Sequence, residues 1–234
     1  MKKLLITICF YLAGTCALPA QEGPKVAPAE PLLSDVCNAL ATLDIHLFRF
    51  DLAAFLSASY AIDLYIDEYE NGRRSRRLRT VRLGKNILTT NDIPEEERDE
   101  ARRNGQIPEG KNEWVNLREL SLYVTKPNDS VATFTVAQDP NGAKAWQNVK
   151  LHPVAGTKRI YYQVRPFSLD TVPAAAPMNV PLLLYGSAWM DRERNVMRFC
   201  GERRIDPAVQ AQLLGRSPHY YVIGLEFQKT AATD

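Results

Sequence analysis

The chain has 234 residues, with 29 Lys+Arg and 27 Asp+Glu, and its apolar fraction of 45% is sufficient for a hydrophobic core. The first 20 residues hold two lysines and no acidic residue, so the remaining 214 carry no formal net charge. This balance argues against a globally basic, nucleic-acid-binding surface. After residue 20, no apolar stretch is long enough to cross a bilayer as a helix.

The N-terminus has the layout of a secretory signal peptide. Lys2 and Lys3 precede an uncharged apolar run from Leu4 to Ala13, and small residues lead to Ala20 before a polar stretch. We therefore predict a leader over residues 1–20 and export to the periplasm or cell surface. A second hypothesis, ranked lower, is a lipid anchor on Cys16, because the residues before it match a lipoprotein signal only weakly.

Residues 21–33 are rich in proline and small residues, which predicts a flexible tether. A single β-rich domain is expected over residues 34–234. It opens with a short helix over residues 34–43, in which apolar positions recur on one side. A second short helix is expected within residues 91–105, beginning at Pro94 and ending at Gly105, with almost no apolar face.

The clearest strand pattern begins at residue 61, where Ile62, Leu64 and Ile66 alternate with polar and aromatic residues. Asn71-Gly72 predicts a hairpin turn, because both residues accept a positive φ. A three-residue loop would place Ile66 opposite Leu78 and Asp67 opposite Arg77, which satisfies both faces, with a bulge near Thr80. We prefer this register to that of a two-residue loop.

A second hairpin is predicted with Leu122 opposite Phe134 and a turn at residues 127–129. Further strands are expected at 148–152, 159–165, 181–190, 195–200 and 219–228, with a short helix beginning at Asp206. Short strands separated by turns, with few helices, predict a mostly β fold. We expect an antiparallel β-sandwich or a jelly-roll-like domain.

The first hairpin provides the candidate ligand-binding surface. Asp63, Tyr65, Asp67 and Tyr69 share one face of their strand, and Arg77 and Arg79 are candidates to lie opposite them. Tyrosine rings can stack on sugars while carboxylates accept hydrogen bonds from hydroxyls, so a glycan-binding sheet is one hypothesis. Catalysis by the paired carboxylates Asp63 and Asp67 is another. A solvated face with cross-strand ion pairs is the interpretation that we favour.

The sequence contains no recognisable metal or nucleophile motif. His46, His152 and His219 lie far apart, so we expect three unrelated histidines, no metal site and no cofactor. The tyrosine pairs at 161–162 and 220–221 are interpreted as ordinary core and rim packing. Cys37 and Cys200 would remain after leader removal, either as a disulfide or as two separate thiols.

The leader end Pro19-Ala20-Gln21, the proline-rich tether and the hairpin segment 67–72 together resemble uncharacterised exported β-rich proteins of Gram-negative gut anaerobes. These proteins form a family of unknown function, so the resemblance implies no activity. It does imply O-glycosylation at Asp-Ser/Thr-aliphatic triplets, which occur here at Ser130 and Thr171.

Two functional hypotheses follow from these observations. The first is an exported envelope or surface domain that binds a glycan or an envelope protein and is not an enzyme. The second is a glycan-active hydrolase that uses paired carboxylates.

Overall fold

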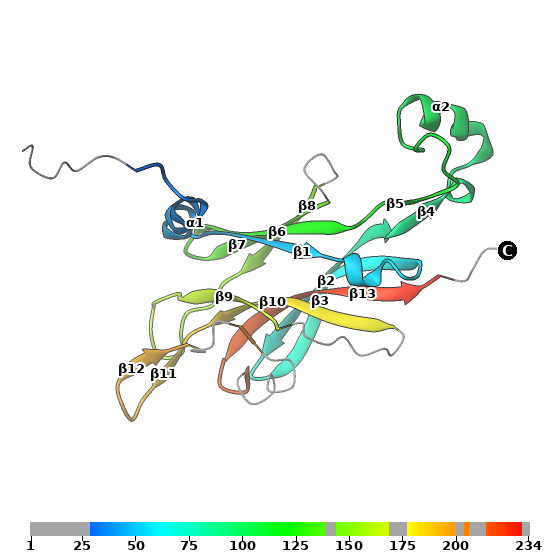
Figure 1. Cartoon of the computed structure of the whole chain (residues 1–234). Coiled ribbons are helices and arrows are strands. Elements are labelled where there is room, and N and C mark those ends of the chain that lie inside the picture. Colours follow the sequence, from blue (N-terminus) through cyan, green and yellow to red (C-terminus); the bar gives the residue numbers. More distant parts are fainter. Residues whose placement is uncertain (1–28, 139–143, 169–176, 200–203, 206–213, 231–234) are drawn as a thin grey trace, which may run out of the picture.

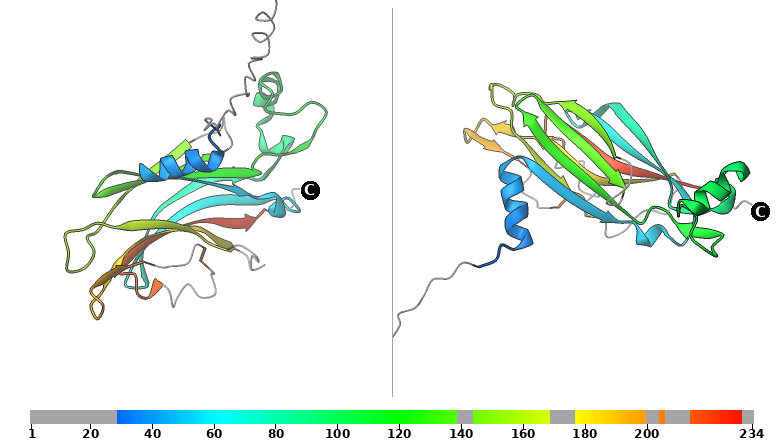
Figure 2. Two further views of the ribbon diagram at one scale, coloured as in Figure 1. Left: turned by 60° about the vertical axis from the view of Figure 1, so that its left-hand side comes forward. Right: turned by 90° about the horizontal axis from the view of Figure 1, so that it is seen from above.

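A computed structural model describes residues 29–138, 144–168, 177–199, 204–205 and 214–230. Two antiparallel sheets lie one above the other and enclose a hydrophobic core, as the two layers in Figure 2 show. The predicted fold class, mostly β with an antiparallel sandwich and few short helices, is confirmed.

The first sheet has four strands in the order β1-β6-β7-β8 (Figure 1). Their bounds are Ile45–Asp51 (β1), Glu119–Asn128 (β6), Val131–Gln138 (β7) and Lys144–Lys150 (β8). The second sheet has five strands in the order β3-β2-β13-β10-β9. Their bounds are Arg73–Lys85 (β3), Tyr60–Glu70 (β2), His219–Lys229 (β13), Met178–Ser187 (β10) and Tyr162–Pro166 (β9).

Two small hairpins and a few short helices complete the described structure. The hairpins pair β4 (Ile87–Thr89) with β5 (Glu113–Val115) and β11 (Trp189–Asp191) with β12 (Val196–Arg198). The α-helices are α1 (Leu33–Thr42) and α2 (Arg98–Arg103), and the 3-10 turns are η1 (Ala53–Phe55), η2 (Thr90–Asp92) and η3 (Glu95–Glu97). Both predicted helices among these residues are therefore confirmed, although the solvated one begins as a 3-10 turn.

The core between the sheets is built by the alternating apolar positions of both layers. Ile62, Leu64 and Ile66 of β2 meet Leu122 and Phe134 of the first sheet. A second, smaller cluster lies on the outer face of the second sheet, where connecting segments cover the sheet. Its members are Tyr65, Phe167, Leu184, Ile205, Leu214, Tyr220 and Val222. The second sheet is therefore buried on both faces over part of its area.

The β2–β3 hairpin differs from the predicted register. Glu70 pairs directly with Arg73, so the loop is the two residues Asn71 and Gly72, both with positive φ. Asp67 does pair with Arg77, as predicted, because a bulge lies between the loop and this pair. A second bulge then places Ile66 opposite Arg79 rather than Leu78, and a third lies next to Ile62. Repeated bulges on β3, rather than a longer loop, keep the apolar side chains of the hairpin on the inner face and the charged pair on the outer face.

The β6–β7 hairpin is confirmed, but its register is shifted by two residues from the prediction. Val124 pairs with Phe134 and Leu122 with Val136, and the turn is Asp129-Ser130. A bulge before Asn128 accommodates Pro127, which has no N–H to donate to the ladder. The inward-facing residues are unchanged, because a shift of two residues keeps each side chain on its face.

Several expectations fall on residues outside the described ranges: the leader over 1–20, the tether as far as residue 28, and the helix from Asp206. Cys16, Thr171 and Cys200 are also among these residues. Among the residues that the structure describes, no helix has the length and apolarity needed to span a membrane.

Candidate functional site

The four predicted residues of β2 share the outer face of the second sheet, but they do not form an open platform. Tyr65 and Asp67 are 5% and 3% exposed. Tyr69 stacks on Tyr220 of β13, with ring centroids 4.7 Å apart. The aromatic rings therefore serve the small outer cluster, and the strand alternation that suggested a ligand surface instead supplies a second layer of packing.

Asp67 is held by arginines from β3. Arg77 donates from Nε to Asp67 Oδ1 at 2.7 Å, and Arg74 Nη1 lies 3.3 Å from Oδ2. The Arg77 guanidinium also bonds Glu226 at 3.0 Å and lies 4.6 Å from the centroid of the Tyr65 ring. The hydrogen bond to Asp67 is the main cause that raises the pKa of Arg77. This carboxylate is thus committed to ion pairs.

Asp63 and Arg79 lie apart from that group. Asp63 Oδ1 is 3.4 Å from Arg82 Nε. Arg79 pairs with Ile66 and donates to the carbonyl oxygen of Trp146 on β8, 2.7 Å away, so it bridges the two sheets. The structure therefore brings Tyr65, Asp67, Tyr69 and Arg77 together and leaves Asp63 and Arg79 with other partners.

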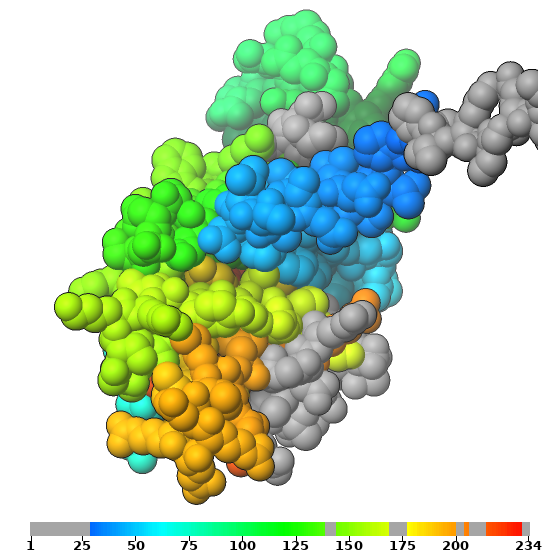
Figure 3. All heavy atoms as spheres, turned by 90° about the vertical axis from the view of Figure 1, so that its left-hand side faces the viewer, coloured from blue at the N-terminus to red at the C-terminus, as the bar shows by residue number. Residues whose placement is uncertain are grey.

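A surface groove lies elsewhere, where the chain before β9 meets β12. Its volume is about 850 Å³, and its walls include Lys158, Arg159, Tyr161, Gln163 and Phe199. Figure 3 shows the surface on which these yellow-green and orange segments meet. Tyr162 packs against the core and Tyr161 is 43% exposed, so one ring of this pair faces inward, as interpreted from the sequence, and the other is open to solvent.

The cations of this groove differ in their pairing. Arg198 is 2.8 Å from Asp191, and Asp129 at the groove is bonded by Lys126 at 3.0 Å. The side chains of Lys158 and Arg159 are exposed and make no ion pair with any described residue. The groove therefore combines an exposed aromatic ring with two free positive charges.

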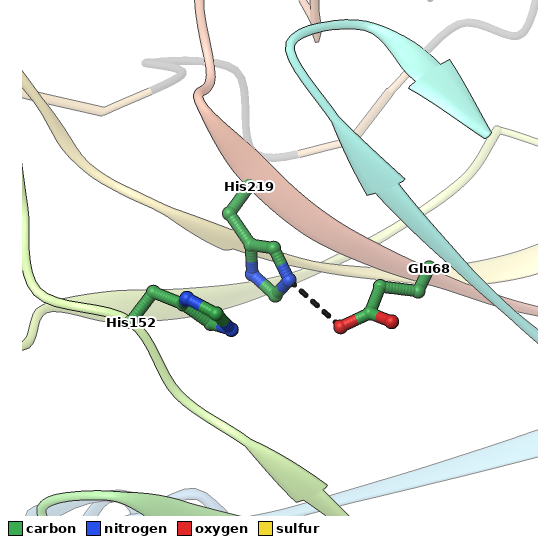
Figure 4. A group of neighbouring side chains, drawn as sticks. All are labelled: Glu68, His152 and His219. Atoms are coloured by element: carbon green, nitrogen blue, oxygen red, sulfur yellow. Dashed lines mark hydrogen bonds and ion pairs between the residues drawn. The ribbon is translucent and has the colours of Figure 1, made fainter. Parts of the chain in front are cut away.

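A polar cluster lies between the two sheets, at the end of the core. It joins Glu68 of β2, His219 and Tyr221 of β13, and His152, which follows β8 (Figure 4). Glu68 and His219 are each 4% exposed. One ligand atom from each of Glu68, His152 and His219 lies within 4.8 Å of the other two. The expectation of three unrelated histidines is therefore wrong for His152 and His219.

Hydrogen bonds fix Glu68. Its Oε1 lies 3.0 Å from His219 Nε2 and accepts from the Tyr221 hydroxyl at 3.0 Å, while Oε2 accepts from Arg76 Nε at 2.6 Å. The Tyr221 hydroxyl also contacts the Lys150 carbonyl at 2.6 Å, which ties β13 to the first sheet. Every oxygen of this buried carboxylate has a partner, as burial of a charge requires.

Tyr162 of β9 links the two histidines. Its hydroxyl oxygen accepts from the backbone N–H of His152 at 3.1 Å, and it lies 2.7 Å from Nδ1 of His219. The hydroxyl therefore donates to Nδ1, which leaves the hydrogen of neutral His219 on Nε2, facing Glu68. The imidazole rings of His152 and His219 are tilted against each other, with centroids 4.3 Å apart.

Burial is the largest single influence on the pKa values in this cluster. Burial is the main cause that lowers the pKa of His219, against the hydrogen bond that its Nε2 donates to Glu68, which raises the pKa. For Glu68, burial acts to raise the pKa, but the hydrogen bonds from Arg76, His219 and Tyr221 together lower it. Burial also raises the pKa of Tyr162 and Tyr221. The resting state is therefore a carboxylate facing a neutral imidazole.

The sequence held only a partial signal for this cluster. Glu68 continues the inward-facing positions of Ile62, Leu64 and Ile66, so a charge on the core side was visible in the alternation. Its histidine partners lie about 80 and 150 residues away along the chain. Only the pairing of β2 with β13, and the passage of the chain after β8, brings them together.

These observations define an antiparallel β-sandwich with a buried carboxylate–histidine cluster and a separate cationic groove. The chain belongs to the family described as a domain of unknown function (DUF5041), whose model matches residues 15–229. No curated protein and no solved structure matches the chain.

Two predicted modification sites are partly described. Ser130 lies exposed in the β6–β7 turn, with its hydroxyl 3.0 Å from Asn128 Oδ1. Cys37 is exposed on α1. O-glycosylation at Ser130 and a disulfide between Cys37 and Cys200 stay predictions.

Proposed function

We propose that this protein is an exported envelope or surface domain that binds a glycan without processing it. Export is supported by the leader pattern of residues 1–20. The observation that carries the binding proposal is the groove beside β9, where the exposed Tyr161 lies among the cations Lys158 and Arg159, which make no ion pair within the described part of the chain.

The groove chemistry favours a saccharide that bears anionic groups. An exposed aromatic ring offers a flat apolar face to the C–H side of a sugar ring. A guanidinium and an ammonium can bind carboxylate, sulfate or phosphate substituents. Gln163, whose side-chain amide contacts the Tyr161 hydroxyl, fixes the orientation of that ring and offers a further polar group. We therefore infer an acidic polysaccharide as the ligand class.

The hydrolase hypothesis has less support. A general acid and a general base need carboxyl groups that face a shared substrate. Asp67 is buried and bonded to two arginines, and Asp63 lies beside Arg82. Both carboxylates lie against arginines instead of facing a shared substrate position, which such a mechanism needs.

Binding by the full chain to acidic and neutral polysaccharides, measured by isothermal titration calorimetry, tests the proposal. We expect binding of acidic polymers that weakens with added salt, because screening reduces the charge attraction. The double variant K158A/R159A should reduce affinity at least about 10-fold, since a charged hydrogen bond contributes about 1.5–3 kcal/mol. Tyr161→Ala should reduce it with less dependence on salt.

The matched control is R103A/K111A, which removes two exposed cations on α2 and the loop after it. Figure 1 shows α2 at the end of the molecule away from β11 and β12. If the control weakens binding as much as K158A/R159A, attraction to the overall charge is the cause and the groove is not the site. Binding of an envelope protein but of no polysaccharide would replace the glycan by a protein partner.

A further inference from the structure

We propose that Glu68, His152 and His219 form a binding site for one divalent transition metal ion of the zinc class. The proposal is independent of glycan binding in the groove. It rests on three ligand-type side chains that converge from separate parts of the chain at the end of the inter-sheet core (Figure 4).

The donor set selects the class of ion. Two imidazole nitrogens and one carboxylate oxygen suit Zn²⁺ and neighbouring transition metals, whereas Ca²⁺ and Mg²⁺ require oxygen ligands. Three protein ligands leave a fourth tetrahedral position for water or a ligand atom. His152 is only half-buried, so an ion can approach the group from solvent at this ligand.

The distances are close to those of a zinc site. Tetrahedral ligands with bonds of about 2.0–2.1 Å lie roughly 3.3 Å apart. His219 Nε2 and Glu68 Oε1 are already 3.0 Å apart, and no two of the three ligand atoms are more than 4.8 Å apart. The remaining adjustment is a small rotation of His152, the most exposed of the three ligands and the one whose ring forms no hydrogen bond with a described residue.

The hydrogen bonds around the ligands suit metal binding. The ion would replace the hydrogen that His219 Nε2 now directs at Glu68, and His219 would carry its one ring hydrogen on Nδ1 instead. Nδ1–H would then donate to the Tyr162 oxygen, and the Tyr162 hydroxyl would rotate its own hydrogen away from Nδ1. His219 stays neutral, so no proton is gained or lost. A partner on the second ring nitrogen is the usual means of orienting a metal-bound histidine. Arg76 holds Oε2 of Glu68, so the carboxylate would bind the ion through Oε1 alone.

Titration of the chelator-treated full chain with Zn²⁺ by calorimetry tests the site, together with Co²⁺ absorption spectroscopy. We expect one ion per chain and the visible bands of four-coordinate Co²⁺ without a sulfur charge-transfer band. His152→Ala should weaken Zn²⁺ binding at least about 100-fold by removing a ligand. Tyr162→Phe, which keeps all three ligands, should weaken it about 10-fold.

Two controls separate this site from adventitious binding. His46→Ala removes the third histidine, which lies on β1 outside the group, and Cys37→Ser removes the exposed thiol. Both should bind Zn²⁺ as the parent chain does. If Glu68 or His219 variants fail to fold, Zn²⁺ binding by His152→Ala still tests the proposal, because His152 is half-exposed. Circular dichroism checks that this variant is folded. No stoichiometric binding, or equal binding by His152→Ala and the parent, would overturn the proposal.

Discussion

Asp67 and Glu68 are neighbours on β2, yet their side chains lie on opposite faces of the second sheet and in different chemistry. Asp67 lies on the outer face, and its partners among the described residues are the cations Arg74 and Arg77. Glu68 lies on the inner face, where one arginine, one imidazole and one phenol share it. Both acids are nearly fully buried, so the difference between them lies in their partners rather than their exposure.

This contrast shows which acid is free to take part in chemistry. The described partners of Asp67 are arginines, which stay protonated at all physiological pH values. The partners of Glu68 include a histidine, which exchanges protons near neutrality and binds metal ions. The outer face is therefore expected to respond to mutation through stability alone, and the inner cluster through stability, metal and pH.

The largest effect should come from Gly224→Ala, which breaks the outer face. Gly224 pairs with Tyr65, whose ring and hydroxyl occupy the space of the missing side chain. An added Cβ would also lie 2.6 Å from the backbone carbonyl oxygen of Val180, which cannot turn aside. Tyr65 and the stacked Arg77 would be displaced. We expect a loss of about 3 kcal/mol in the free energy of unfolding, measured in urea.

Gly186→Ala on β10 is the matched control. Its added Cβ would come no closer than 3.4 Å to another atom, so its loss should stay below about 1 kcal/mol. Similar losses in the free energy of unfolding for both variants would show that the close contact between Gly224 and Tyr65 is not what makes Gly224→Ala destabilising.

Removal of one arginine from each acid compares the two faces directly. Arg77→Ala leaves buried Asp67 with Arg74 alone, at 3.3 Å. We expect a loss of about 2 kcal/mol, below the value for a fully buried pair because the Arg77 side chain is 32% exposed. Arg76→Ala leaves Glu68 with His219 and Tyr221, so its loss should be smaller. Denaturation of both variants in urea measures the difference, and an equal loss would contradict it.

A third comparison uses the phenol of Tyr162. Tyr162→Phe leaves the backbone N–H of His152 and Nδ1 of His219 without their partner. The expected loss is about 1.5 kcal/mol in the free energy of unfolding, because both groups lose a hydrogen bond in a largely buried place. Tyr185→Phe is the control: this ring packs against Tyr162, and its hydroxyl makes no hydrogen bond with a described residue. A comparable loss for Tyr185→Phe would assign the effect to packing.

The fold was largely accessible from local patterns, because alternation and turn residues act over a few positions. The Asn71-Gly72 turn and the inward positions Ile62, Leu64 and Ile66 were correctly assigned. The register was not, since bulges on β3 depend on how both faces of β2 are buried. A face that looks polar in the sequence proved to be covered, because the covering residues Phe167 and Leu214 come from distant segments.

The candidate sites were less accessible for the same reason. Asp67 and Arg77 were paired correctly, because they lie on one hairpin. His152 and His219 carry no spacing that marks them as neighbours, and their approach depends on the contact between β13 and the end of β8. The exposure of Tyr161 is likewise set by tertiary structure, because alternation along an edge strand does not show which ring faces solvent.

The smallest effect is a dependence of stability on pH that belongs to the inner cluster. Burial holds the pKa of His219 below its usual value of about 6.5. As the pH falls from 7 to 6, His219 takes up more proton in the unfolded chain than in the folded chain, so stability is lost. The loss from His219 in this interval is at most about 0.7 kcal/mol. The lowered pKa of Glu68 adds a further loss only as the pH falls below about 4.5.

Urea unfolding at pH 7 and pH 6 measures this dependence, with His219→Gln as the test and His46→Gln as the control. Burial also lowers the pKa of His46, so each variant should remove the part of the stability change between pH 7 and pH 6 that its own histidine contributes. A parent chain that gains stability between pH 7 and 6 would mean that His219 becomes protonated beside Glu68. In that case the effect of the Glu68 carboxylate on the pKa of His219 is larger than the effect of burial. Glu68 and His219 would then form an ion pair, as Asp67 and its arginines do.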